Sequence, residues 1–140
     1  MTNTVIDASS FLNLIKNRGD QASDTLKQSI TIPLIYYEIG NALRTSAVHL
    51  KHITPEEAEI TLKNLHKGLG IMAITPQDNI EDSSKILQNS ITYNLSYYDS
   101  AYLTAAIKHN ATLATEDRKL AKAANNANII TINTEKLPTG

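Results

Sequence analysis

Short apolar runs alternate with longer amphipathic stretches along the chain. Five runs rich in β-branched or apolar residues predict strands at 4–6, within 30–35, and at 71–74, 112–114 and 128–132. Helices are expected in between, starting with one over the apolar residues at 11–15. The next has an apolar stripe at helical spacing, formed by Ile39, Ala42, Leu43, Ala47 and Leu50. Because parallel strands need crossovers that helices usually supply, this alternation predicts a parallel sheet.

Two later helices are predicted by their start signals. Thr54-Pro55-Glu56-Glu57 places an N-cap threonine before a proline at the first helical position and a carboxylate at the third. Thr75-Pro76-Gln77-Asp78 repeats that arrangement. The whole pattern predicts an α/β fold, a three-layer α/β/α sandwich around a central parallel sheet of four to five strands.

Length and composition narrow the class of protein. The chain has 140 residues, 41% of them hydrophobic, which predicts one domain over 1–140. With 13 Lys and Arg against 14 Asp and Glu, the formal net charge of −1 means that any polyanion must be met by a local basic patch. The absence of cysteine excludes disulfides, thiolate zinc sites and cysteine nucleophiles, and leaves oxygen or imidazole as metal ligands.

Other classes are disfavoured by what the sequence lacks. The amino-terminal stretch has no secretory leader, and no uncharged apolar run approaches the ~18 residues of a membrane span, so we expect a cytoplasmic protein without a membrane. A glycine-rich phosphate loop is missing, which disfavours dinucleotide and nucleoside triphosphate binding. The histidines form no compact ligand motif.

Four carboxylates stand where capping or solvation explains them incompletely: Asp7, Glu38, Asp99 and Asp117. In open parallel sheets, ligands bind beyond the carboxyl ends of the strands. Asp7 follows the first strand, and the alternative is that it only caps the next helix. Glu38 lies in the first turn after the second strand, where a negative charge also complements the helix dipole. Asn41, at i+3, is placed to hold Glu38 by a hydrogen bond.

Asp99 and Asp117 also have local alternatives. Ser96-Tyr97-Tyr98-Asp99 fits a capping box, but the helix that follows is apolar on nearly every face, so its acidic end should be poorly solvated. Asp117 follows the fourth strand and opens a basic helix, where capping and ion pairing alone would also explain it. Glu116 is adjacent, and the pattern leaves open which of the two points into the site.

The predicted fold brings three of these acids to one edge of the sheet, and Asp99 could join them from a neighbouring helix. Like charges about 5 Å apart repel by roughly 3 kcal/mol per pair at an effective dielectric constant near 20. That repulsion is large beside a stability of ~5–15 kcal/mol, and a bound cation would relieve it. Ligation by oxygen alone favours Mg²⁺ or Mn²⁺.

The stretches that hold these acids resemble the PIN domain family, and within it the VapC-type toxins of prokaryotic toxin–antitoxin pairs. The matching stretches are VIDAS at 5–9, YEIGNAL at 37–43, LSYYDSAYL at 95–103 and LATEDRKL at 113–120. The resemblance implies an endoribonuclease that uses Mg²⁺ or Mn²⁺ to hydrolyse RNA phosphodiester bonds. It also implies that these acids are its catalytic metal ligands: Asp7, Glu38, Asp99 and Asp117.

Further residues and partners follow from the same resemblance. Three polar residues close to the acids are candidates to orient them: Ser9, Asn41 and Thr115. The family implies an RNA substrate, a small VapB-type antitoxin whose tail covers the acidic groove, and a homodimer. The exposed apolar helix expected around Leu43 and Leu50 supports the dimer.

Basic and aromatic residues near these stretches have two interpretations each. Four basic residues are candidates to contact RNA phosphates, although solvated helix faces carry such residues anyway: Arg44, Arg118, Lys119 and Lys122. The pairs Tyr36-Tyr37 and Tyr97-Tyr98 each precede an acid of the predicted site. Base stacking would explain them, but core or dimer packing is the favoured interpretation.

Two rival functions use the same fold class. A phosphoacceptor signalling domain would want an acidic pair at the first strand and a lysine beyond a late strand, and the segments around Asp7 and after Ile132 fit this poorly. A non-catalytic PIN-fold module that binds RNA or protein would not need the complete acidic set.

Overall fold

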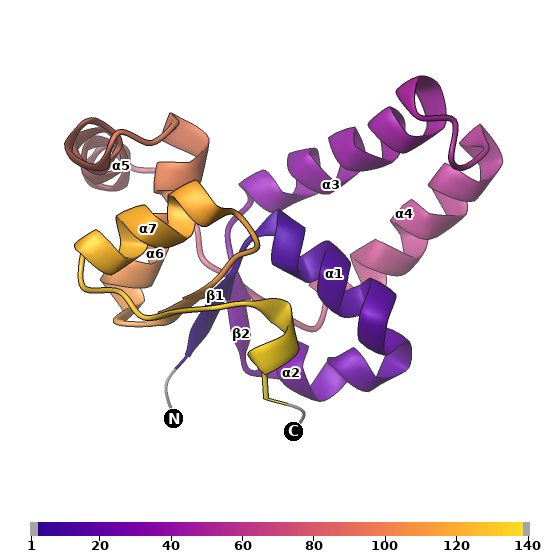
Figure 1. Ribbon diagram of the computed structural model, residues 1–140, viewed down its shortest axis with the longest axis horizontal. Helices are drawn as coiled ribbons and strands as arrows, with labels where there is room; N and C mark the ends of the chain where they lie inside the picture. Colours follow the sequence, from indigo (N-terminus) through magenta and orange to yellow (C-terminus); the bar gives the residue numbers. More distant parts are fainter. Residues whose placement is uncertain (1–2, 139–140) are drawn as a thin grey trace.

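The computed structural model describes residues 3–138, which form a five-stranded parallel sheet between two layers of helices (Figure 1). The sheet order is β3-β2-β1-β4-β5. The strands are short: β1 (Thr4–Ile6), β2 (Ser29–Thr31), β3 (Ala73–Ile74), β4 (Thr112–Ala114) and β5 (Thr131–Ile132). The predicted parallel sheet is confirmed.

Helices cover both faces of the sheet, which confirms the three-layer prediction. In Figure 1 the first four helices lie on one side and the last three on the other. The first group is α1 (Ala8–Arg18), α2 (Ser23–Lys27), α3 (Leu34–Arg44) and α4 (Pro55–Leu69). The second group is α5 (Ile80–Tyr93), α6 (Tyr97–His109) and α7 (Arg118–Asn126). Short 3-10 turns at Gly19–Ala22 and Thr134–Lys136 complete these connections.

The core has two parts because neighbouring residues of a strand face opposite sides of the sheet. Val5 packs in the cluster that holds Tyr102 and Leu120, under α6 and α7. Ile6 packs in the other cluster, with Phe11 and Leu69 from α1 and α4. Each such buried aliphatic side chain stabilises the fold by about 1.5–3 kcal/mol, so β1 holds both layers together.

The two predicted helix starts have different outcomes. At Thr54 the capping box is present, with the Thr54 hydroxyl and the Glu57 side chain each bonded to the other's backbone N–H, and α4 begins at Pro55. The predicted start at Thr75 is wrong. The N–H of Thr75 donates to the carbonyl of Thr31 at 2.9 Å, which extends the sheet past β3. Asn79 then caps α5, which begins at Ile80.

The predicted apolar helix around residues 39–50 is present but changes form. Helix α3 ends at Arg44 and continues as a π-helical turn over Thr45–His49. In Figure 1 α3 and α4 project from the body as a hairpin. Leu43 packs partly against the core, whereas 54% of Leu50 is exposed at the tip. None of the described helices is long and apolar enough to cross a membrane.

The order in which strands are added to the sheet reverses at β1, and this reversal determines where the candidate site lies. From β1 the sheet grows through β2 to β3 on one side and through β4 to β5 on the other. The loops after the two central strands diverge there and leave a crevice at their carboxyl ends. Because Ile6 pairs with Ala114, the residues that follow, Asp7 and Thr115, emerge side by side.

Candidate active site

Asp7 lies at the centre of the candidate site, at the end of β1. Its Oδ1 accepts hydrogen bonds from the Ser10 N–H at 2.9 Å and the Ser9 hydroxyl at 2.8 Å. Its Oδ2 accepts from the Thr115 hydroxyl at 2.5 Å. Asp7 does cap α1, as its local alternative predicted. Capping occupies only Oδ1, so it does not explain why the second oxygen of a buried carboxylate faces the loop after β4.

Glu38 reaches the same region from α3. The helix begins at Leu34, so Glu38 lies in its second turn and not in the first as predicted. The helix dipole acts mainly within the first turn and therefore explains this carboxylate less well. Oε1 of Glu38 accepts a hydrogen bond at 2.6 Å from the hydroxyl of Tyr102, a buried residue of α6. Asn41 lines the cleft beside Glu38, but Tyr102 supplies the bond that was expected from Asn41.

Asp99 is in the first turn of α6. The Ser96 hydroxyl caps this helix by accepting from the Asp99 N–H at 3.0 Å, as the motif predicted. That bond uses only the backbone of Asp99. The carboxyl group remains half-buried, close enough to Asp117 for their charges to interact.

Asp117 and Glu116 diverge after β4, which answers the question that the pattern left open. The N–H of Asp117 donates to the Thr115 hydroxyl at 3.0 Å, and the Asp117 Oδ1 caps α7 by accepting from Leu120 at 2.9 Å. Glu116 turns away, because its Oε1 accepts from the Thr134 backbone at 2.7 Å and from the Thr134 hydroxyl. Asp117 is therefore the acid on the Asp99 side.

Burial and the charges of neighbouring carboxylates together raise the pKa values of three acids in the site. Burial raises the pKa of Asp7, more than the hydrogen bonds from Thr115, Ser10 and Ser9 lower it, and the charge of Asp99 adds to the rise. Burial also raises the pKa of Glu38, with further increases from the charges of Asp7 and Asp99.

The pKa of Asp99, the third acid, is raised for the same reasons. Burial raises the pKa of Asp99, and the charge of Asp117 raises it further, while Lys119 opposes the rise. The hydrogen-bonded proton of Tyr102 is held firmly, because burial and the neighbouring Glu38 raise the pKa of its phenol above the usual value. Tyr102 therefore remains a donor to Glu38 at neutral pH.

A cleft of about 340 Å³ opens between α3 and α6, lined by Glu38, Asn41, Ser96, Asp99 and neighbouring side chains. The carboxylate oxygens of the acids are suitable ligands for a hard divalent cation. Binding such a cation would also reduce the repulsion between their negative charges. Between residues 3 and 138, however, no three Asp, Glu or His side chains already stand at metal-binding spacing. An ion held by these acids would have to draw them together.

Sequence reasoning located the acids and the hydroxyls of Ser9 and Thr115, which the structure brings onto Asp7. It missed Tyr102. The signal was present, since Tyr102 follows Asp99 by three residues along the same helix. What the pattern lacked was the pairing of this phenol with Glu38, 64 positions earlier.

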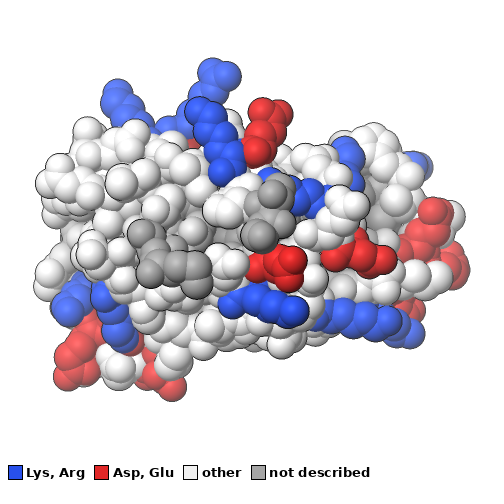
Figure 2. All heavy atoms as spheres, turned by 90° about the horizontal axis from the view of Figure 1, so that it is seen from below, with Lys and Arg blue, Asp and Glu red and all other residues white. Residues whose placement is uncertain are grey.

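The basic candidates are divided between two places. Three of them are exposed on α7 beside the site: Arg118, Lys119 and Lys122. Arg44 lies at the far end of α3, where its guanidinium is 3.3 Å from the His49 ring. On the face seen from below the view of Figure 1, Figure 2 shows positive and negative side chains interspersed. Among the described residues on that face, the picture shows no extended patch of one sign, whereas α7 carries three exposed basic residues.

Comparisons with known proteins bear on the family and the fold. A family model described as PIN domain matches residues 4–126. Among curated proteins, none gives a significant match. PAE2754 from Pyrobaculum aerophilum is similar in structure, with a TM-score of 0.76 and 21% identity over 97% of this chain and 86% of that one.

Two further solved structures have lower scores. FitAcB from Neisseria gonorrhoeae has a TM-score of 0.64 and 16% identity, covering 96% of this chain and 99% of its own. VapBC-1 from nontypeable Haemophilus influenzae has a TM-score of 0.63 and 14% identity, covering 95% of this chain and 98% of its own. Because all three identities are low, these similarities show a shared fold and nothing more.

Proposed function

From the premise that this chain belongs to the PIN domain family, we propose that it is a Mg²⁺- or Mn²⁺-dependent endoribonuclease and the toxin of a VapBC-type toxin–antitoxin pair. One observation carries the proposal. Carboxylates from four separate places in the sequence lie near the carboxyl edge of the sheet, and burial, with a further contribution from the charges of neighbouring acids, raises the pKa of three of them. At neutral pH, where these acids are ionised, the fold gains no stability from such an arrangement, which points to a ligand that needs it.

In this proposal the four acids hold the cation, and neighbouring residues orient the acids or attract the RNA. Asp7, Glu38, Asp99 and Asp117 would hold the ion, which when bound supplies positive charge at the scissile phosphate and activates water. Thr115 and Ser9 orient the Asp7 carboxylate, and Tyr102 orients that of Glu38, so each carboxylate keeps a defined direction while the ion draws the acids together. Lys119, whose charge reaches Asp99, is placed to attract the RNA backbone.

We also propose partners of the kind that this family implies. The antitoxin would be a small VapB-type protein whose tail covers the acidic cleft in the cytoplasm. The name of one similar structure, VapBC-1, supports a pairing of this kind. A homodimer is supported by Ile80, Leu87 and Ile91, large exposed side chains at i, i+7 and i+11 along one face of α5. Monomeric behaviour in light scattering at high concentration would contradict the dimer.

The test of the activity is cleavage of a mixed RNA substrate by purified protein in Mn²⁺, in Mg²⁺ and in excess chelator. Wild type should cleave only with metal, and a folded Asp7→Asn variant should not cleave. The matched control is Asp24→Asn, which removes an exposed acid from α2 and should leave cleavage unchanged. Cleavage that survives in chelator or in Asp7→Asn would contradict the assignment. Metal binding without turnover on any RNA would favour the non-catalytic binding module.

A further inference from the structure

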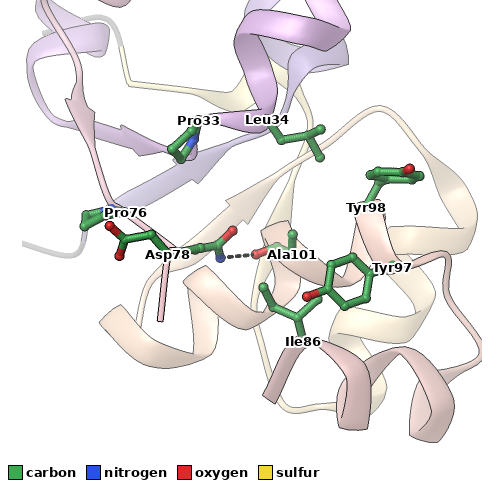
Figure 3. Close-up of a pocket in the computed structure, with 9 residues that line it drawn as sticks. Pro33, Leu34, Pro76, Asp78, Ile86, Tyr97, Tyr98 and Ala101 are labelled. Atoms are coloured by element: carbon green, nitrogen blue, oxygen red, sulfur yellow. Dashed lines mark hydrogen bonds between the residues drawn. The ribbon is translucent and has the colours of Figure 1, made fainter. Parts of the chain in front are cut away.

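An apolar pocket of about 370 Å³ lies beside the acidic cleft and plays no part in the chemistry proposed above (Figure 3). It lies between the start of α3, the loop before α5 and the start of α6. Its walls are mostly apolar or aromatic: Pro33, Leu34, Pro76, Ile86, Tyr97 and Ala101. The loop is held in place because the Gln77 amide donates to the Ala101 carbonyl at 2.8 Å.

The pocket adjoins the acidic cleft. Leu34 and Tyr98 line both spaces. Leu34 lies one helical turn before Glu38 on the same face of α3, and Tyr98 is the residue before Asp99. A nucleotide chain whose phosphate lies at the acids therefore has the pocket within reach of an adjacent base.

The tyrosines here do not pack in the core, whereas the favoured interpretation of the Tyr97-Tyr98 pair was packing in the core or in a dimer. Tyr97 is 42% exposed and Tyr98 is 61% exposed. Exposed aromatic rings at the edge of a pocket are suited to stacking, and every nucleobase presents a face that can stack. The sugar and phosphate would stay at the rim, in water.

The polar groups of the pocket indicate which bases fit best. The Asp78 carboxylate is exposed at the rim and can only accept hydrogen bonds while ionised. The pocket lining contains no Lys, Arg or His. A base that offers an exocyclic amino group can donate to Asp78, as cytosine does to acidic side chains in other nucleic-acid complexes. Uracil has no such group, and its one donor on that edge, the N3–H, lies between two carbonyl oxygens that repel a carboxylate.

We infer that this pocket binds the base of the RNA nucleotide next to the cleaved phosphate and favours bases with an amino group over uracil. The inference rests on the proposed nuclease function and adds a specificity site to it. Tyr97 is the stacking platform, and Asp78 is the residue that discriminates between bases.

The test maps cleavage positions on a pool of random-sequence single-stranded RNA in Mn²⁺ by sequencing the products. Wild type should show one flanking position that is depleted in uracil. Tyr97→Ala should lower kcat/KM on preferred sequences by roughly 5- to 150-fold, the range for one lost base stack, and should flatten the preference. Tyr97→Phe keeps the ring and should retain it. Asp78→Asn, whose amide can also donate, should admit uracil.

Ile60→Ala changes an exposed apolar residue on α4 and is the matched control that should leave the cleavage pattern unchanged. Wild-type cleavage without a flanking preference, or a preference that Tyr97→Ala and Asp78→Asn leave intact, would overturn the inference and leave the nuclease function standing. A Tyr97→Ala variant that alters only the oligomeric state would mean that a protein fills the pocket. If wild type cleaves no RNA with either metal, the nuclease function fails and the pocket assignment fails with it.

Discussion

Thr115→Val is the substitution that most cleanly probes the contact between the ends of β1 and β4. Valine keeps the shape of the buried side chain and removes its hydroxyl. That hydroxyl donates to Oδ2 of Asp7 and accepts from the N–H of Asp117, so the change leaves a buried carboxylate oxygen and a partly buried N–H without these partners.

The expected cost follows from these two bonds. A hydrogen bond to a charged group contributes about 1.5–3 kcal/mol, and the unpaired N–H adds about 1 kcal/mol, for a total loss of roughly 2.5–4 kcal/mol. For a chain of 140 residues this lowers Tm by roughly 9–14 °C. The cost should shrink at low pH, because protonated Asp7 no longer receives a charge-assisted bond.

Urea denaturation in chelator at pH 7 and at pH 4 measures both effects. Thr115→Ser retains the hydroxyl and should lose only about 0.8 kcal/mol for the buried methyl group. Thr131→Val, which removes an exposed 3.3 Å contact with Asn125, should change the free energy of unfolding by less than about 0.5 kcal/mol. A loss below about 1 kcal/mol for Thr115→Val, or the same loss at both pH values, would refute the reasoning.

Three more predictions concern the acids and the fold. Tyr102→Phe removes the donor to Glu38 and should cost about 1.5–3 kcal/mol in urea denaturation and slow RNA cleavage, and unchanged values for both would count against the pairing. Asp7, Glu38 and Asp99 have folded-state pKa values raised above the unfolded ones, so the stability they contribute is complete below about pH 4 and is lost as pH rises through the folded values. In chelator, Asp99→Asn should therefore gain stability over wild type as pH increases from 4 to 8, and a variant that is less stable throughout would contradict this sign. Asn79→Ala should cost about 1 kcal/mol because Asn79 caps α5, and no loss in thermal unfolding would mean that the helix begins elsewhere.

The sheet could be predicted from the sequence because its signals are local. Val5 and Ile6 are apolar on both faces, which is typical of a central parallel strand, and Thr54-Pro55 marks a helix start by its own side chains. Thr75-Pro76 carries the same local signal and fails. The N–H of Thr75 is bonded to β2, a partner more than 40 positions earlier in the chain, and that contact is invisible to a local motif.

The acids of the site were predicted in the same way, by their positions after strands and in a motif. The hydrogen bonds that orient these acids could be predicted only in part. Ser9 is two residues from Asp7, so its bond is a local one, whereas Tyr102 and Glu38 meet only because α6 and α3 pack on opposite sides of the same strand end. The exposure of Tyr97 was also hidden, since periodicity cannot tell that a loop leaves a pocket open beside it.

The most direct test of the central claim, that these carboxylates form one divalent cation site, is a calorimetric Mn²⁺ titration of wild type and single variants at neutral pH. We expect one saturable binding event, weakened by at least about tenfold in Asp7→Asn, Glu38→Gln, Asp99→Asn and Asp117→Asn and unchanged in Asp24→Asn. Wild type that binds no Mn²⁺ at millimolar concentration, or variants that bind it as tightly as wild type, would contradict the claim.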